Sequence, residues 1–149
     1  MTVPTRNDKK QPSHKVAFEE KGQRAERSTD AYRQKLGSTE TALCEKCGMI
    51  YRSKRWLLDE TETAQLRMQS DISKIVCPAC QRMADGNPAG IVTMSGSYLR
   101  EHEDDILNMI KRTEARSRTK NPLGRIMAIN QENNVLTIAT TEDKLAQKL

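Results

Sequence analysis

The sequence predicts a protein of the α+β class, and three features of the chain lead to this prediction. The four cysteines form two C-x-x-C pairs, Cys44/Cys47 and Cys77/Cys80, a spacing typical of metal-stabilised modules. After residue 87, short apolar runs flank one long stretch with helical periodicity. Residues 1–41 are polar and charged, with few branched apolar side chains. We therefore expect a disordered basic arm over 1–41, a four-cysteine ribbon over 42–86 and a small β-α-β-β-α unit over 87–149.

The composition of the 149 residues limits the class of protein further. Aromatic residues make up only 3% of the chain, so we expect a thin apolar core that needs an additional staple. The N-terminal sequence has no apolar stretch after its basic residues, and no segment reaches the ~18 apolar residues of a membrane span. These features predict a cytoplasmic protein without membrane association, in a compartment that keeps thiols reduced.

The predicted ribbon contains strand and helix signals between its cysteine pairs. Residues 49–51 indicate a strand that leaves the first pair. Asp59 is a helix N-cap candidate with Glu62 three residues later, which predicts a helix over 59–69. The apolar residues over 72–76 lead into the second pair.

The region after the turn at 85–88 shows a different periodicity. Residues 91–94 predict a buried strand, and Ser97 is expected to cap a helix that continues to about Thr119. Two strands follow over 125–130 and 135–140, joined by a polar turn. Thr140-x-x-Asp143 is expected to open a last helix. With one further strand, this order would be ferredoxin-like.

The spacing of the cysteines predicts one structural Zn²⁺. Two residues between ligands allow a tight turn to place both sulfurs on one edge of a tetrahedron, and two such knuckles complete the shell. The predicted ligands are Cys44, Cys47, Cys77 and Cys80. Two alternatives stay open: an iron–sulfur cluster held by the same residues, and a thiol redox pair at Cys77-Pro78-Ala79-Cys80.

Clusters of cations suggest contacts with nucleic acid. We expect phosphate or base contacts from two groups, Arg52, Lys54, Arg55 and Trp56 near the cysteines, and Lys111, Arg112, Arg116 and Arg118 in the long helix. Over 111–125 six cations, with Lys120 and Arg125 included, face only Glu114. The alternatives are that Trp56 is buried and that these cations only balance a negatively charged zinc centre and a helix dipole.

Catalytic signals are scarce. There is no phosphate-binding G-x-x-x-x-G-K loop and no G-x-S-x-G motif. His102 lies on the apolar stripe of the predicted helix, between Leu99 and Ile106, which indicates a core histidine. We therefore expect a protein that is not an enzyme.

From Leu43 onward the sequence resembles a family of small bacterial zinc-ribbon proteins. The residues that carry the resemblance are CEKCGMIYRSKRW, CPACQRMADGNPAGIVTMSGSYLREHEDDILNMI, NPLGRIMAIN and LTIATTEDKLAQKL. In its cysteine pairs that family is similar to the zinc-binding region of the eukaryotic adaptor that exports large ribosomal subunits. The resemblance implies the four cysteine ligands, association with RNA or the ribosome, and a chain that continues past the helix near Glu142.

These observations support three hypotheses for the function. The first is a zinc-binding protein without enzymatic activity that associates with RNA or the ribosome. The second is a protein-interaction or regulatory adaptor that uses the ribbon as a scaffold, and the third is a thiol redox enzyme. An exposed sheet edge in the second region would also allow two copies to pair as a homodimer.

Overall fold

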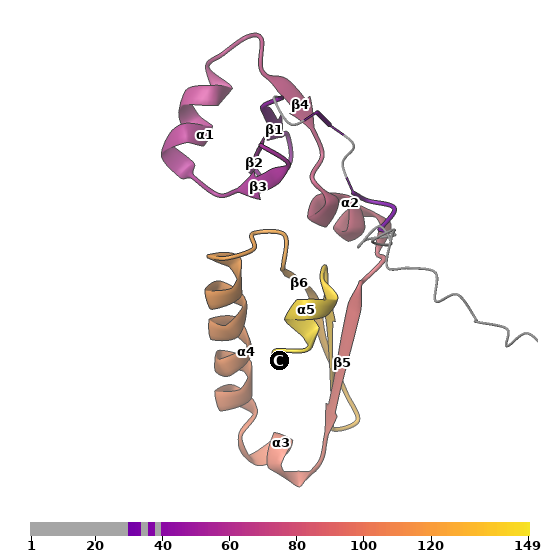
Figure 1. Ribbon diagram of the computed structural model, residues 1–149. Helices are drawn as coiled ribbons and strands as arrows, with labels where there is room; N and C mark the ends of the chain where they lie inside the picture. The colour runs from indigo at the N-terminus through magenta and orange to yellow at the C-terminus, as the bar shows by residue number, and fades with distance from the viewer. Residues whose placement is uncertain (1–29, 34–35, 38–39) are drawn as a thin grey trace, which may run out of the picture.

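The computed structural model of the protein describes residues 30–33, 36–37 and 40–149. Helices and strands are mixed along the chain, which confirms the predicted α+β class. They form two separate sheets, one above the other in Figure 1. We call residues 42–86 the cysteine unit and residues 87–149 the second unit. Within the described ranges, no helix has the length and apolar character needed to cross a membrane.

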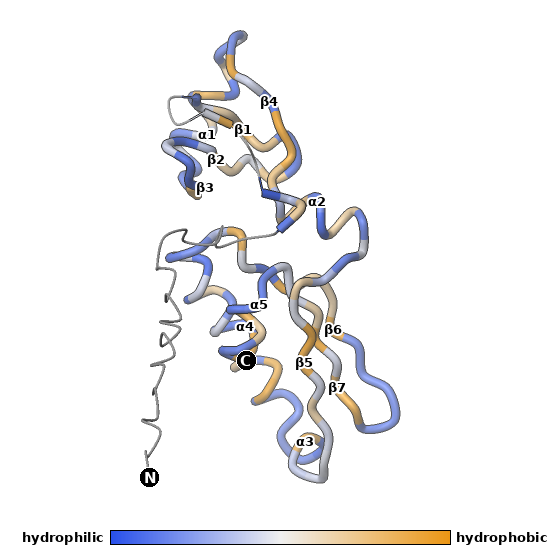
Figure 2. Tube along the Cα trace, turned by 45° about the vertical axis from the view of Figure 1, so that its right-hand side comes forward, coloured by the Kyte–Doolittle hydropathy of each residue, from blue (hydrophilic) through white to orange (hydrophobic). Residues whose placement is uncertain are grey.

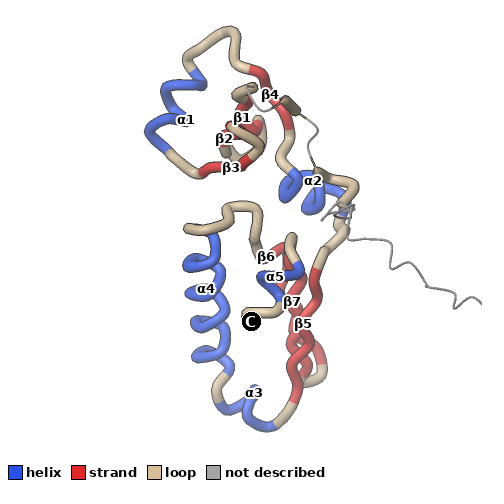
Figure 3. Tube along the Cα trace, viewed as in Figure 1, coloured by secondary structure: helices blue, strands red, loops and turns tan. Residues whose placement is uncertain are grey.

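The cysteine unit is built from short elements. They are β1 (Ala42–Cys44), β2 (Ile50–Arg52), β3 (Arg55–Leu57), α1 (Glu60–Arg67), β4 (Ser73–Ile75) and α2 (Pro78–Asp85). The sheet order is β3-β2-β1-β4, with β1 antiparallel to β2 and parallel to β4. Leu66 of α1 packs against Leu43 and Ile50 of the sheet. Helix α1 therefore covers part of this small sheet, as Figure 3 shows.

Local signals in the sequence account for several of these elements. The side chain of Asp59 accepts a hydrogen bond of 2.9 Å from the backbone N–H of Glu62, which confirms the predicted cap of α1. Ser53 and Lys54 both have positive φ, 51° and 62°, and form the two-residue turn between β2 and β3. Such a turn suits the twist of a hairpin.

A described part of the predicted arm contacts the cysteine unit. Most of residues 1–41 lie outside the described residues, so their predicted disorder stays a prediction. Asp30 forms an ion pair of 2.8 Å with Arg82 of α2. The hydroxyl of Tyr32 donates to Asp85 at 2.9 Å, and its ring lies 4.5 Å from the guanidinium carbon of Arg82. Residues 30 and 32 therefore contact α2, while the disorder of the arm stays a prediction.

The second unit has longer strands and one apolar core. Its elements are β5 (Gly90–Ser95), α3 (Ser97–Glu101), α4 (Glu103–Arg118), β6 (Ile126–Glu132), β7 (Val135–Thr140) and α5 (Asp143–Ala146). The sheet is antiparallel in the order β5-β7-β6. Leu136 and Ile138 alternate along β7 and pack with Ile110 of α4 and Leu99 of α3. Strand β5 is an edge of this sheet, and its pairing with a second copy stays a prediction.

The single long helix predicted over 97–119 is wrong, because the structure has two helices there. Its backbone leaves the helical region at His102 (φ −127°, ψ 27°), which ends α3 and begins α4. The imidazole is 40% exposed, stacks on Tyr98 with ring centroids 4.1 Å apart, and lies 3.8 Å from Asp105. The prediction of a core histidine is therefore wrong, because the break rotates this side chain out of the apolar stripe.

The start of the last helix also differs from the prediction. Thr140 is the final residue of β7, and Glu142 is the N-cap of α5. The Thr140 hydroxyl donates to the Glu142 carbonyl at 2.7 Å instead of capping the helix. Thr140 therefore belongs to the sheet and not to the start of the last helix.

Candidate metal centre

The first cysteine pair lies on the turn between β1 and β2. Cys44 ends β1, and its carbonyl accepts from the Gly48 N–H at 2.9 Å. Gly48 has φ +76°, and a Cβ there would lie 2.9 Å from the guanidinium of Arg67 and 3.0 Å from Thr63. A side chain would thus meet both strain and close contacts at this position. The glycine after Cys47 allows the chain to turn tightly under α1.

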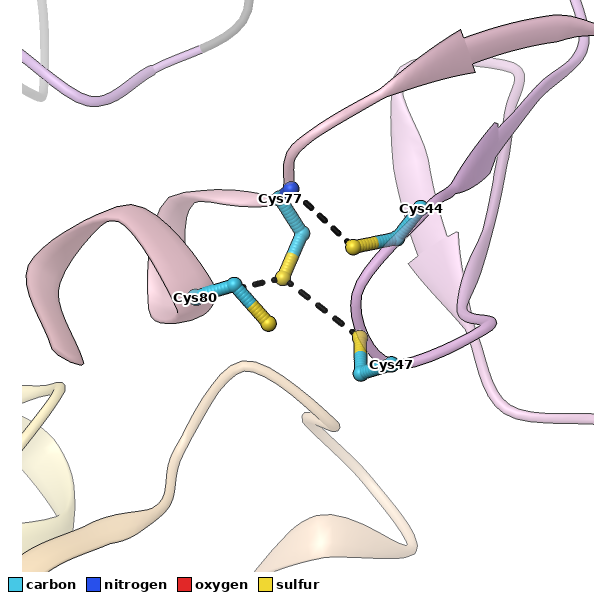
Figure 4. Close-up of side chains that lie close together, drawn as sticks. All are labelled: Cys44, Cys47, Cys77 and Cys80. Atoms are coloured by element: carbon cyan, nitrogen blue, oxygen red, sulfur yellow. Dashed lines mark hydrogen bonds between the residues drawn. The ribbon is translucent and has the colours of Figure 1, made fainter. Parts of the chain in front are cut away.

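The second pair lies at the start of a helix. Cys77 is the N-cap of α2 and its sulfur accepts a hydrogen bond of 3.4 Å from the N–H of Cys80, while Pro78 begins the helix. Proline suits this position because its missing N–H would have no partner in the helix. The predicted second knuckle is thus the first turn of α2, as Figure 4 shows.

The four sulfurs converge between these two elements. They lie within 4.8 Å of one another, and Sγ of Cys47 is 3.7 Å from Sγ of Cys77. Zn–S bonds of about 2.3 Å in a tetrahedron require sulfurs about 3.8 Å apart. The predicted clustering of Cys44, Cys47, Cys77 and Cys80 is therefore present, and its size fits one such ion.

Backbone donors and neighbouring thiols set the electrostatics of the cluster. The N–H of Cys77 donates to Cys44 Sγ at 3.3 Å. Hydrogen bonds from the Cys44 and Cys77 thiols lower the pKa of Cys47. Interactions with Cys44 and Cys47, and then burial, raise the pKa of Cys77, and burial raises the pKa of Cys80. Without a metal, these pKa shifts favour a thiolate at Cys47 and protonated thiols at Cys77 and Cys80, whose protons a bound cation would displace.

Arg125, from the second unit, reaches this cluster. Its Nη1 lies 3.8 Å from Cys80 Sγ. Burial alone would lower the pKa of Arg125, but a hydrogen bond to Cys47 and the charge of that thiolate, followed by interactions with Cys77 and Cys80, raise it. In the sequence Arg125 belongs to the cation cluster over 111–125, because no spacing rule connects residues 45 positions apart.

Four cations that lie near the cysteines in the sequence could balance the charge of the centre, and two of them form ion pairs with other groups. Arg52 pairs with Glu62 at 2.8 Å, and Arg82 pairs with Asp30 at 2.8 Å. Lys46 and Lys54 are exposed.

The residues predicted to contact nucleic acid differ in how exposed they are. Trp56 is only 8% exposed and packs on Tyr51 with ring centroids 5.2 Å apart. The prediction that a base stacks on its ring is therefore wrong. Arg118 is half-buried, and its Nε is buried without a hydrogen-bond partner among the described residues. The other predicted cations are exposed, Arg52 in its ion pair with Glu62 and the remainder without one in the described ranges: Lys54, Arg55, Lys111, Arg112 and Arg116.

Comparison of the chain with protein families, curated proteins and solved structures finds no match. The family resemblance described above therefore rests on the quoted motifs alone.

Proposed function

We propose that the protein is a zinc-binding module without enzymatic activity that binds RNA phosphates, on the ribosome or free. The observation that supports metal binding is the cluster of four cysteine sulfurs, which all lie within 4.8 Å of one another. Four thiolates fill a tetrahedral shell and leave no open position, which suits a structural ion. Zn²⁺ would be held by Cys44, Cys47, Cys77 and Cys80, and it would supply the folding free energy that a small apolar core lacks.

Metal analysis tests this half directly. Protein purified without added metal is expected to contain one zinc per chain and no iron, and both Cys44→Ser and Cys77→Ser are expected to lose it. Iron with sulfide absorption would support a cluster instead. Protein that contains neither metal, and that does not take up zinc, would overturn the metal half of the proposal.

The RNA half rests on exposed cations whose charge stays uncompensated. Lys111, Arg112 and Arg116 are exposed on α4, and among the described residues none of them forms an ion pair. Glu114 is the acid closest to them in sequence, but its carboxylate accepts from the Ile126 N–H at 2.8 Å. The helix surface therefore keeps its positive charge, which attracts phosphates.

The second exposed group lies toward the same end of the molecule. Lys54 and Arg55 are exposed at the turn and start of β3. In Figures 1 and 2 the β2–β3 hairpin lies above the C-terminal end of α4, and the end of α4 is hydrophilic in Figure 2. This arrangement supports the proposal that cations of both units contact one nucleic-acid backbone.

A salt-dependent binding measurement tests the RNA half. Zinc-loaded protein is expected to bind single-stranded RNA and ribosomes at low salt, with affinity that falls steeply as salt increases. Replacing Arg112 and Arg116 together by Ala is expected to reduce the log–log salt slope by about 1.4, since each lost phosphate contact contributes about 0.7. A matched control replaces the exposed Lys74 and Lys144, which lie on other elements and change the net charge equally.

The outcomes separate the two main hypotheses. Equal loss of affinity in both double variants would indicate a general charge effect and no defined surface. Absence of binding at low salt by zinc-loaded protein would overturn the RNA half and favour the protein-interaction adaptor.

A further inference from the structure

The loop that joins α4 to β6 is the element that brings the second unit to the cysteines. Its residues, 121–125, are held by their own hydrogen bonds, from the Leu123 N–H to Asn121 Oδ1 at 3.2 Å and from the Gly124 N–H to the Asn121 carbonyl at 3.1 Å. The buried Thr141 hydroxyl accepts from the Arg125 N–H at 2.8 Å. The loop is thus a fixed part of the second unit.

Two side chains of this loop contact the cysteine unit. Leu123 packs against the buried cluster that contains Cys44, Cys77 and Trp56. The guanidinium of Arg125 is held by the Pro122 carbonyl, 3.4 Å from Nε, and directs Nη1 to Cys80 Sγ at 3.8 Å. The apolar contact and the polar contact therefore lie on the same loop.

The charge of Arg125 has no carboxylate partner. Among the described residues no Asp or Glu oxygen lies within ion-pair distance of it, and its Nη2 is buried without a hydrogen-bond partner. A half-buried guanidinium needs an anion nearby to offset its desolvation. The anion available is the cysteine cluster, which has a formal net charge of −2 when four thiolates hold Zn²⁺.

We infer that Arg125 is an outer-shell positioning residue of the metal centre, which donates to the Cys80 thiolate and docks the second unit on the cysteine unit. The inference rests on the zinc site proposed above. Outer-shell donors orient metal ligands and tune their basicity. Here the donor comes from the other unit, so metal binding in one unit also fixes the position of the other.

Four variants of the full chain separate this role from packing and from charge. Arg125→Ala removes the donor, and Arg125→Lys keeps the charge. Leu123→Ala loosens the docking without removing the hydrogen bond, and Arg112→Ala removes an equal charge at an exposed site on the same unit. Each variant is loaded with Zn²⁺ for competition against a chelator, and with Co²⁺ for absorption spectra.

Arg125→Ala is expected to weaken zinc binding by roughly 10–100-fold. Its thiolate-to-cobalt absorption is expected to move to longer wavelength, because the sulfur lone pairs lose a stabilising N–H donor. Arg125→Lys is expected to restore part of both properties. Leu123→Ala and Arg112→Ala are expected to keep the wild-type cobalt spectrum. If Arg125 had only a structural role, Arg125→Ala would keep the wild-type spectrum as well.

Hydrogen exchange of the zinc-loaded proteins tests the docking. Amides of 121–125 are expected to exchange several-fold faster in Arg125→Ala and in Leu123→Ala than in wild type or Arg112→Ala. A wild-type zinc affinity and cobalt spectrum in Arg125→Ala would overturn the inference. Failure of the wild-type protein to bind either metal would overturn the proposed function instead, so the two failures are distinguishable.

Discussion

The cysteine unit and the second unit bury their cores in different ways. Each strand of the cysteine unit has three residues, and its buried cluster includes the metal-ligand candidates Cys44 and Cys77. Strands of the second unit have six or seven residues, and its core consists of aliphatic side chains around Ile110, Leu136 and Ile138. Short strands bury too little apolar surface to offset chain entropy. The same chain thus places four candidate metal ligands where the buried apolar area is small, and relies on aliphatic packing where that area is larger.

The largest expected effect is the loss of one cysteine. Cys77→Ser should release the metal and unfold residues 42–86, because structural zinc supplies roughly 10 kcal/mol or more in comparable sites. Residues 90–140 should keep their protection against hydrogen exchange. Treatment of the wild-type protein with a chelator is the control and should give the same pattern. Retained protection of the cysteine unit in metal-free protein would mean that packing alone holds it.

A smaller effect is expected from the aromatic part of the cysteine unit. Trp56→Ala removes a buried ring that packs on Tyr51, and such losses cost about 3–5 kcal/mol. Because folding and metal binding are coupled in structural zinc sites, we expect the cost to appear as weaker zinc affinity in chelator competition. Leu58→Ala, at a side chain that is 52% exposed, is the control and should leave the affinity nearly unchanged. Similar affinities for both variants would show that the ring does not support the metal site.

The corresponding change in the second unit should leave the metal in place. Ile110 is fully buried on α4, and its replacement by Ala should cost about 2–5 kcal/mol of the free energy of unfolding of that unit. Met109 is adjacent and 48% exposed, so Met109→Ala should have little effect. Thermal unfolding followed together with zinc content measures both. Loss of zinc from folded Ile110→Ala protein would contradict the separation of the two cores.

The smallest expected effects concern two glycines. A Cβ at Gly90 would lie 2.6 Å from Cβ of Ala146 and 2.8 Å from Oγ1 of Thr140. Gly90→Ala should therefore push α5 from β5 and cost about 1–3 kcal/mol. Gly86 has φ +61° with open space around it, so Gly86→Ala should cost only the backbone strain, about 1 kcal/mol. Denaturant unfolding should show that Gly90→Ala lowers the stability of the second unit and that Gly86→Ala lowers the stability of the cysteine unit, where α2 ends. An unchanged stability of Gly90→Ala would show that α5 does not pack tightly on this strand.

Most of the correct predictions rest on interactions between residues that are close together in the chain. Two residues between cysteines make a pair of ligands on one turn, and the Asp59 cap acts on an amide three residues away. The alternation of apolar residues in β5 and β7 and the helical stripe through Ile110 place the second unit's core. These signals act over one or two turns of chain, so they can be detected without tertiary contacts.

Contacts between distant residues decided the rest. Trp56 is buried in a cluster that also holds Cys77 and Ala79 from the other side of α1 in the sequence, whereas the sequence alone left burial and exposure both open. His102 breaks the long helix, so its ring leaves the apolar stripe that sequence periodicity assigned to it. Arg125 reaches Cys80 because a loop of the second unit lies against the cysteine unit, whereas its position in the sequence groups it with the cations of the long helix. The sequence by itself therefore determined the candidate ligands and the main elements, while the neighbours of those ligands depend on packing between residues far apart in the chain.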